Sequence, residues 1–266
     1  MKSGITTACV TDKGLSAHYT VNEDSYLILE LDGAFAVADG VGGANAGDLA
    51  SQTALRTISK LIKEARGNTP PTSLNFVRSL IDAGNQVVYQ LGQQRQRQVA
   101  STIALMLIKD GVAILGHVGD SRIYVHREDK LIQLTKDHSK LQNLIDNSLI
   151  TEKERADFQE RHIITKALGA GATVEPDLQK VILKKNDLFI LCTDGIYIHN
   201  TDEEILRNAT KNKNNLAKIC DTLKKNCYSR GAKDNLTAIV VKVEGQEFKK
   251  GSLAVSQDMM DTVIKK

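Results

Sequence analysis

Residues 33–43 read GAFAVADGVGG and join a short apolar run to an Asp-Gly pair and a glycine-rich segment. The apolar run has the length and composition of a β-strand, and Asp39 closes it. A helical pattern of apolar residues follows over about 46–65. The segment lacks the Gly-Lys-Ser/Thr ending of a nucleotide-binding loop and the spacing of a dinucleotide fingerprint. We therefore expect its glycines to let the backbone approach a metal ion and to begin the helix.

Similar short apolar runs recur along the chain, several of them bounded by Gly, Asp or Asn. Two further helical patterns cover about 72–94 and 215–228. The strand-like runs follow one another without a helix between each pair, unlike the alternation of a doubly wound parallel sheet. This order predicts an α+β fold of largely antiparallel sheets covered by helix pairs. The predicted strands are SYLILEL (25–31), AFAVAD (34–39), STIALMLIK (101–109), VAILGHVGD (112–120), RIYVHRE (122–128), KLIQLT (130–135), QKVILK (179–184), DLFILCTDG (187–195) and LTAIVVKVE (236–244).

The length of 266 residues, with 41% hydrophobic and 25% charged content, is that of an ordinary globular chain. We predict one domain over 1–244 and a C-terminal tail over 245–266 that is either a docked helix or disordered. Residues 137–166 are polar and helical in pattern, without a long apolar run, and are predicted to form a surface insertion.

Composition also bears on location and partners. No run of 18 apolar residues and no signal-peptide core occur, so we expect a cytoplasmic protein without membrane contact. Four cysteines without a C-x-x-C pair predict buried free thiols. A net charge of +3 and 4% aromatic residues argue against nucleic-acid binding. Residues 207–233 hold eight Lys or Arg against one acid, which favours a solvated helix face over a site for an acidic partner.

Acidic residues mark the ends of several predicted strands. Asp39 and Asp194 close strands, Asp234 opens one, and Glu23 and Asp120 lie in NEDS and HVGDSR. A single Asp-Gly after a strand is usually only a turn. Five such acids together indicate carboxylates that converge on one edge of the core, where their repulsion requires a cation. All-oxygen ligands favour Mg²⁺ or Mn²⁺, and two such ions support hydrolysis of a phosphoester.

Eight motifs occur in an order that resembles the metal-dependent serine/threonine protein phosphatases of type 2C, in their compact bacterial form. The resemblance extends from about Thr6 to Val243. It implies two packed, mainly antiparallel sheets flanked by helix pairs, with a small mobile helical flap at 137–166. The motifs are NEDS, VADGVGG, STIAL, HVGDSRIYV, LTKDHS, ITKALG, LCTDGI and DNLTAIVV.

The resemblance also implies roles for individual residues. Asp39 would bridge two Mn²⁺ or Mg²⁺ ions, with Glu23 and the Gly40 carbonyl completing one ion's protein ligands. Asp194 and Asp234 would complete those of the other. A third, weaker ion, found in many members, would lie between Asp194 and Asp120. Asp24 would orient the reacting water, so the implied catalytic set is Asp39, Asp194, Asp234 and Asp24.

Two positions depart from the family pattern. Val41 stands where animal members have a histidine proposed as general acid. Tyr19 stands where the family usually has the arginine that clamps the substrate phosphate. A phenol bonds phosphate more weakly than a guanidinium, so we expect about a tenfold loss of transition-state stabilisation. His18 or Lys13 could compensate, although an exposed strand histidine is the more ordinary account of His18. Tyr19 and His18 are therefore the candidate phosphate-binding residues.

The predicted function is hydrolysis of phosphoserine and phosphothreonine in phosphorylated proteins, by a monomeric enzyme that opposes a cognate serine/threonine kinase. The alternative is a pseudophosphatase that binds phosphoproteins as a scaffold, which the loss of the arginine clamp motivates. Retention of all the acids favours the enzyme, because a binding module has no chemical need for them. A phosphatase with an aspartate nucleophile would need an Asp-x-Asp after an early strand, and the sequence has none there.

Overall fold

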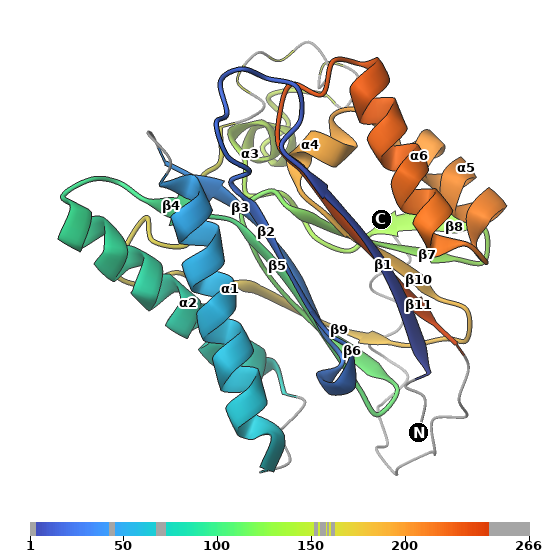
Figure 1. Cartoon of the computed structure of the whole chain (residues 1–266), viewed down its shortest axis with the longest axis horizontal. Coiled ribbons are helices and arrows are strands. Elements are labelled where there is room, and N and C mark those ends of the chain that lie inside the picture. Colours follow the sequence, from blue (N-terminus) through green and yellow to red (C-terminus); the bar gives the residue numbers. More distant parts are fainter. Residues whose placement is uncertain are drawn as a thin grey trace.

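The computed structural model describes residues 4–42, 46–67, 73–151, 154, 158, 160 and 163–244. Two antiparallel sheets pack face to face, and helix pairs cover their outer faces (Figure 1). The predicted α+β fold is therefore confirmed. The predicted tail at 245–266 and the central glycine-loop residues 43–45 lie outside the described residues.

Both sheets are built from antiparallel neighbours. The first has the order β1 (Ile5–Asp12), β11 (Leu236–Val243), β10 (Leu188–Cys192), β7 (Arg122–Arg127) and β8 (Lys130–Gln133). The second has the order β2 (Asp24–Leu29), β3 (Ala34–Val41), β5 (Ile103–Lys109), β6 (Val112–Val118) and β9 (Asp177–Ile182), and the short β4 (Ala100–Ser101) pairs with β3.

The alternation of side chains along β3 shows how the layers are specified. Phe35 and Val37 point into the core between the sheets. The intervening small residues Ala34, Ala36 and Ala38 face the helix layer, which they allow to pack closely. Because neighbouring side chains of a strand point to opposite faces, one apolar run supplies two cores at once.

Three of the four helices that cover the sheets lie where their patterns predicted. α1 (Gly47–Glu64) and α2 (Leu74–Arg95) cover the second sheet, while α5 (Asp202–Asn212) and α6 (Leu216–Ser229) cover the first. Short turns of helix complete the set: η1 (Glu30–Asp32), η2 (Ala65–Gly67), α3 (Lys140–Asp146) and α4 (Asp194–Tyr197). Among the described residues, no helix combines the length and hydropathy needed to cross a bilayer.

The strand β1 and the covering helix α5 were not predicted. β1 carries three threonines and lies at the edge of its sheet, half-buried along most of its length, so it lacks a long apolar run. α5 is short, and its start is marked by a capping box in which Thr201 and Glu204 bond each other's backbone N–H groups. That local signal was present in the sequence, but the helix carries few apolar residues to form a recognisable stripe.

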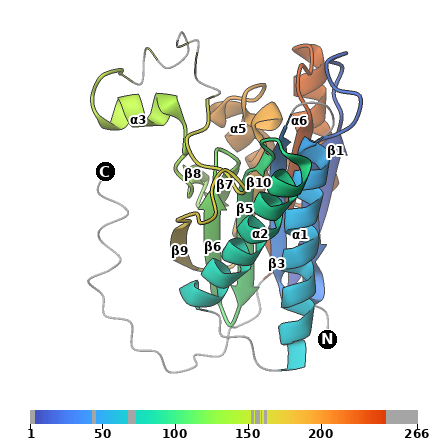
Figure 2. The same cartoon turned by 90° about the vertical axis from the view of Figure 1, so that its left-hand side faces the viewer.

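The predicted surface insertion begins later than expected. Asp137, His138 and Ser139 are buried rather than exposed, because Asp137 pairs with the guanidinium of Arg122 and Ser139 caps α3. Figure 2 shows α3 projecting from the sandwich beyond β8. Ser139 and Ile164 form an isolated β-bridge that closes the base of the insertion. Its identification as a mobile flap stays a prediction.

Candidate active site

The predicted acids come together at one end of the sandwich, from both sheets. Asp24 begins β2 and lies directly opposite Asp39 in the β2–β3 register. Asp194 begins α4 immediately after β10, and Asp120 lies in the turn between β6 and β7. The charges of Asp24, Asp120 and Asp194 all act on Asp39. The prediction that Asp39 closes its strand is wrong, because β3 continues through Val41 by pairing with β4.

Burial and mutual repulsion raise the pKa values of these carboxyls. Burial is the main cause of a pKa well above the usual range for Asp39 and Asp194, and the neighbouring aspartates add to it. Burial likewise raises the pKa of Asp24 to about 7 and that of Asp120 to about 7. The Asp39 and Asp194 side chains lie close enough to interact directly, and two such carboxyls without a cation between them avoid repulsion only when one of them holds a proton. A divalent cation would take the place of that proton.

Three buried carboxylate oxygens at this end, on Asp24, Asp48 and Asp194, have no hydrogen-bond partner among the described residues. Asp24 Oδ2 accepts a hydrogen bond from Thr193 Oγ1 at 2.8 Å. Asp24 Oδ1 and Asp194 Oδ1 are buried, and no hydrogen bond reaches them from the described residues. Buried oxygens without donors are costly in free energy, and a hard cation satisfies them. The donor set therefore fits Mg²⁺ or Mn²⁺.

Glu23 is tied to three parts of the site through its backbone. Its carbonyl accepts bonds from Gly40 N at 3.1 Å and Ser51 Oγ at 2.7 Å, while its N–H donates to Asn235 Oδ1 at 2.7 Å. Asn235 follows Asp234, so this bond fixes Glu23 relative to the start of β11. The result is a defined position for a carboxylate that lies in a loop.

The glycines, which were predicted to let the backbone approach a metal ion, allow β3 and α1 to pack closely, and the approach to a metal ion stays a prediction. A Cβ on Gly40 would lie 1.8 Å from the carbonyl oxygen of Gly47, and one on Gly47 would lie 2.8 Å from Glu23 Cδ. Any side chain at either position would push α1 away from the acids. α1 also brings Asp48 to the site, a residue that the sequence did not indicate. Burial is the main cause that raises the pKa of Glu23, and the charge of Asp48 adds to it. A hydrogen bond from the Gly47 N–H acts in the opposite direction.

The loop between β1 and β2 carries the candidate phosphate-binding residues. Tyr19 is half-buried, and its hydroxyl is hydrogen-bonded to the Asp234 carboxylate; burial and this bond raise the Tyr19 pKa. His18 is exposed, and its ring meets that of Tyr19 edge-on at a centroid distance of 5.2 Å. Lys13 Nζ donates to Tyr19 O at 2.9 Å and to Ser16 O at 3.4 Å. Lys13 therefore holds the loop's backbone.

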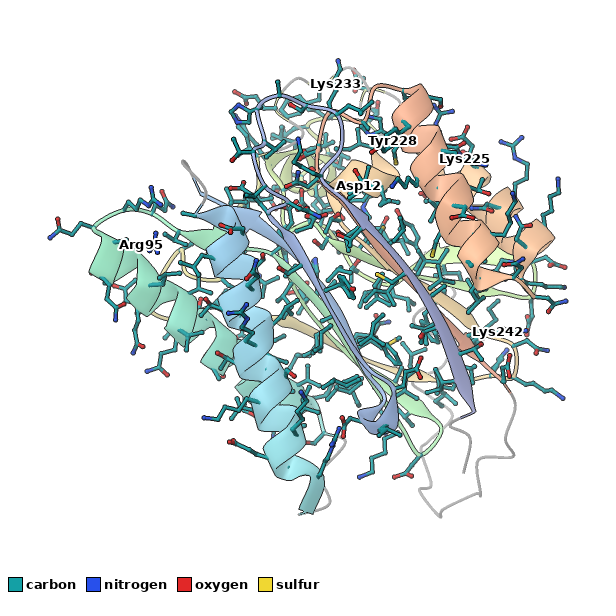
Figure 3. The ribbon with its side chains drawn as sticks, in the orientation of Figure 1. Asp12, Arg95, Lys225, Tyr228, Lys233 and Lys242 are labelled. Atoms are coloured by element: carbon teal, nitrogen blue, oxygen red, sulfur yellow. The ribbon has the colours of Figure 1, made fainter. Side chains whose placement is uncertain are left out.

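An ion-pair cluster anchors the start of this loop. Asp12 accepts hydrogen bonds from Tyr228 Oη at 2.7 Å and from Lys224 Nζ at 2.6 Å. Figure 3 shows Asp12 and Tyr228 facing each other between β1 and α6. The cluster uses one lysine of the basic segment 207–233, and Arg230 of that segment pairs with Glu204. These two pairs give part of the basic stretch a structural role.

A further group of polar residues was missed by the sequence reading. His117, His138 and Asp177 each offer an atom within 4.8 Å of the others. They are separated by long stretches of sequence, and neither histidine belongs to a metal-binding spacing motif. No local signal could have brought them together.

Comparison with known proteins agrees with this geometry. Residues 16–240 match the family described as Protein phosphatase 2C. Protein phosphatase PhpP of Streptococcus pneumoniae is 30% identical over 212 residues, covering 79% of this chain and 86% of that protein. The serine/threonine phosphatase stp of Listeria innocua is 29% identical over 237 residues, covering 87% of this chain and 93% of that protein.

Solved structures show the same relationship. The Mycobacterium tuberculosis serine/threonine phosphatase PstP superposes with a TM-score of 0.82 at 29% identity, covering 91% of this chain and 99% of that one. The PstP catalytic domain in complex with two manganese ions gives a TM-score of 0.79 at 30% identity, with the same coverage of 91% and 99%.

The chain belongs to the protein phosphatase 2C family. The predicted class, a metal-dependent protein serine/threonine phosphatase that uses divalent cations, is therefore confirmed.

Proposed function

We propose that this chain hydrolyses phosphoserine and phosphothreonine in proteins at a centre of two Mn²⁺ or Mg²⁺ ions. Glu23, Asp39, Asp194, Asp234 and the Gly40 carbonyl would hold the two ions, and Asp120 with Asp194 a third, weaker one. The observation that carries the proposal is the group of buried aspartates whose pKa values are raised by burial and by one another. A buried group of ionised carboxylates is stable only where cations neutralise its charge.

When bound, the cations would supply positive charge for the phosphate oxygens and lower the pKa of a water molecule. The protein's own groups then determine geometry. Asp24 has one oxygen fixed by Thr193 and a second, buried oxygen without a donor in the described part of the chain. We assign Asp24 the role of orienting the attacking water and holding its proton. The Thr193 bond keeps the Asp24 carboxylate from rotating away.

Tyr19 has a role at the substrate side of the site. Its hydroxyl interacts with Asp234, a proposed metal ligand, and this supports a position for Tyr19 beside the substrate phosphate. A neutral phenol donates one hydrogen bond and carries no charge. The cations would therefore neutralise most of the phosphate charge, and Tyr19 would contribute to the orientation of the phosphate.

The direct test is hydrolysis of a phosphothreonine peptide with Mn²⁺, with EDTA and Asp39→Asn as controls. We expect turnover that EDTA abolishes and that Mn²⁺ restores. A matched control is Asp32→Asn, since Asp32 is an acid of the η1 turn whose carboxylate pairs with Arg66. Mn²⁺-independent turnover, or equal rates for the unsubstituted chain and Asp39→Asn, would overturn the proposal.

The pseudophosphatase alternative makes a different prediction for the same protein. It expects the phosphopeptide to bind without release of phosphate, with or without Mn²⁺. Unaltered affinity in Asp39→Asn together with no turnover in the unsubstituted chain would favour it. A cognate kinase, a monomeric state and a cytoplasmic location stay predictions.

A further inference from the structure

A trough runs between α1 and the outer edge of β2, and we call it the β2–α1 trough. β2 is the last strand of its sheet, and among the described strands it pairs only with β3. Figure 1 shows α1 packed alongside β2, on the side of the sandwich where β1 is the edge of the other sheet. The trough has a volume of about 910 Å³. This volume is in the range of ligand-binding clefts, which hold about 300–1,000 Å³.

One wall of the trough is the edge of β2, from Asp24 to Leu27. The outer side of an edge strand presents backbone N–H and C=O groups that can bond an added strand. Tyr26 lies on this wall with 46% of its surface exposed, so its ring offers apolar contact to a neighbouring chain. The wall therefore suits a polypeptide segment in an extended conformation.

The opposite wall is one face of α1, and it carries positive charge. Arg56, Lys60 and Lys63 lie exposed on this face, and Glu64 is the only exposed acid among the described residues that line the trough. Lys60 Nζ is 3.8 Å from Glu64 Oε1 within the helix. Arg56 donates to the neutral Gln52 at 3.1 Å, and neither Arg56 nor Lys63 has an acidic partner among the described residues. The excess of cations complements an acidic segment.

The position of these cations distinguishes them from an ordinary solvated helix face. They line a hollow that they share with an unpaired strand edge, rather than an open convex surface. One end of the hollow is lined by Asn22 and Asp24, and Asp24 lies opposite Asp39 in the β2–β3 register. The trough therefore begins at the candidate active site and leads away from it along α1.

The geometry of α1 gives the distance of the cations from the acids. α1 begins at Gly47, whose N–H bonds the Glu23 carboxylate. With a rise of about 1.5 Å per residue, Arg56 lies about 14 Å and Lys63 about 24 Å along the helix from Gly47. An extended chain advances about 3.3 Å per residue. The cations are therefore within reach of residues about four to seven positions from a phosphorylated residue at the acids.

We propose that the β2–α1 trough binds an acidic, extended segment of the phosphoprotein substrate, about four to seven residues from the phosphorylated residue. This inference rests on the phosphatase function proposed above and adds a second place of substrate recognition. The cations of α1 bind the carboxylates of the segment, and the edge of β2 bonds its backbone. Contacts this far from the reacting phosphate stabilise substrate and transition state equally, so they lower KM and leave kcat unchanged.

The test compares phosphothreonine peptides that differ only in a distal segment, in the presence of Mn²⁺. The segment covers about four to seven positions from the phosphothreonine, on its N-terminal or its C-terminal side, and consists of glutamates or of glutamines. A short peptide without the segment measures basal turnover. On one of the two sides, we expect the glutamate peptide to have a KM about three- to tenfold below that of its glutamine counterpart, with the same kcat. High salt should reduce this preference, because the charges are exposed.

Paired charge reversals locate the preference on the molecule. Arg56→Glu combined with Lys63→Glu should abolish it and leave kcat/KM for the short peptide unchanged. Both side chains are exposed, so the fold is retained. The matched control is Lys218→Glu combined with Lys225→Glu, which makes the same charge change at exposed positions of the same spacing on α6, over the other sheet. The control should keep the preference.

The experiment separates failure of this inference from failure of the phosphatase function. Absence of turnover with the short peptide contradicts the phosphatase function, and the same peptides, labelled for fluorescence anisotropy, then compare binding directly. Equal KM values, or equal affinities, for glutamate and glutamine peptides on both sides would overturn the docking proposal. A preference that survives Arg56→Glu with Lys63→Glu, or that the control pair removes equally, would overturn it as well.

Discussion

Buried acids occur in two settings in this molecule. Some are paired with an arginine and stabilise the fold, and others are grouped together at the candidate active site. Asp137 and Asp187 each accept charge-assisted bonds from two nitrogens of one arginine, Arg122 and Arg127 respectively. The acids at the end of the sandwich are surrounded mainly by other acids. Within the described residues, the main causes that shift the pKa values of Asp39 and Asp194 are burial and other aspartates, and no lysine or arginine is among these main causes.

The comparison teaches that the chain can neutralise a buried carboxylate when only stability is required. At the candidate active site it leaves that task to a cation. Removal of an acid should therefore have opposite consequences in the two settings: loss of activity with little loss of stability at the site, and loss of stability at an arginine pair.

The largest expected effect is on catalysis. Asp194→Asn should lower kcat/KM by about 10³-fold or more, because a proposed ligand of two ions is lost. In metal-free protein the same change should leave the urea midpoint unchanged or higher, since it removes a buried, repelled charge. Initial rates with Mn²⁺ and urea unfolding in EDTA measure the two parts. A variant with full activity would end the distinction between the two settings.

The next effect is on stability. Arg122→Met should lower the free energy of unfolding by about 3–5 kcal/mol, since it removes the positive charge that neutralises the buried Asp137 carboxylate. Urea denaturation with fluorescence or circular dichroism measures it. Arg78→Met is the control, because the Arg78–Glu175 pair is largely exposed and its loss should be nearly neutral. Equal losses of unfolding free energy in both variants would show that burial does not determine how much an ion pair contributes to stability.

Metal binding should neutralise the repelling acids and so raise the free energy of unfolding. Free Mn²⁺ at 100 times its dissociation constant should stabilise the chain by about 2.7 kcal/mol through mass action. Thermal unfolding with and without Mn²⁺ measures the shift. The gain should largely disappear in Asp194→Asn but persist in Asp137→Asn. A gain that survives in Asp194→Asn would place the Mn²⁺ elsewhere.

A substitution at Tyr19 tests how much a positively charged side chain would add to phosphate binding. Tyr19→Arg should lower KM and raise kcat/KM by about tenfold, because a guanidinium bonds phosphate more strongly than a phenol. Steady-state kinetics with a phosphothreonine peptide measure it. An unchanged KM would mean that another group already supplies the contact, and His18→Ala would then identify whether that group is the neighbouring imidazole.

The smallest effect concerns an exposed pair and its pH dependence. The hydrogen bond from Arg230 is the main cause that lowers the pKa of Glu204 to about 2, below its ordinary value of 4.5. A lowered pKa contributes stability above the ordinary value, and that contribution is lost as pH falls toward 2. Glu204→Gln should therefore cost less than about 1 kcal/mol at pH 7, and the difference should narrow by pH 3. Urea midpoints at both values test this; a gap that widens at low pH would contradict it.

The sheets, most of the helices that cover them and the acids of the candidate site could be predicted from the sequence, because these predictions depend on local patterns. Apolar runs bounded by Gly or Asp marked most strands, and helical spacing marked α1, α2 and α6. The edge strand β1 was missed, because a strand half-exposed on its sheet needs no apolar run. Buried Asp137 was read as the start of a surface segment, because the arginine that neutralises it lies on another strand.

The sequence by itself determined which side chains are available: the carboxylates for hard cations, the glycines where α1 meets β3, and Tyr19 in place of an arginine. Only the tertiary structure decided which of them meet. The register of β2 and β3 places Asp24 opposite Asp39. Tyr19 interacts with Asp234, which is more than 200 residues later in the sequence. His117, His138 and Asp177 lie close together although they come from separate segments. The physical reason is that propensity and periodicity act over a few residues, whereas pKa shifts and ligand geometry arise between residues brought together by the packing of two sheets.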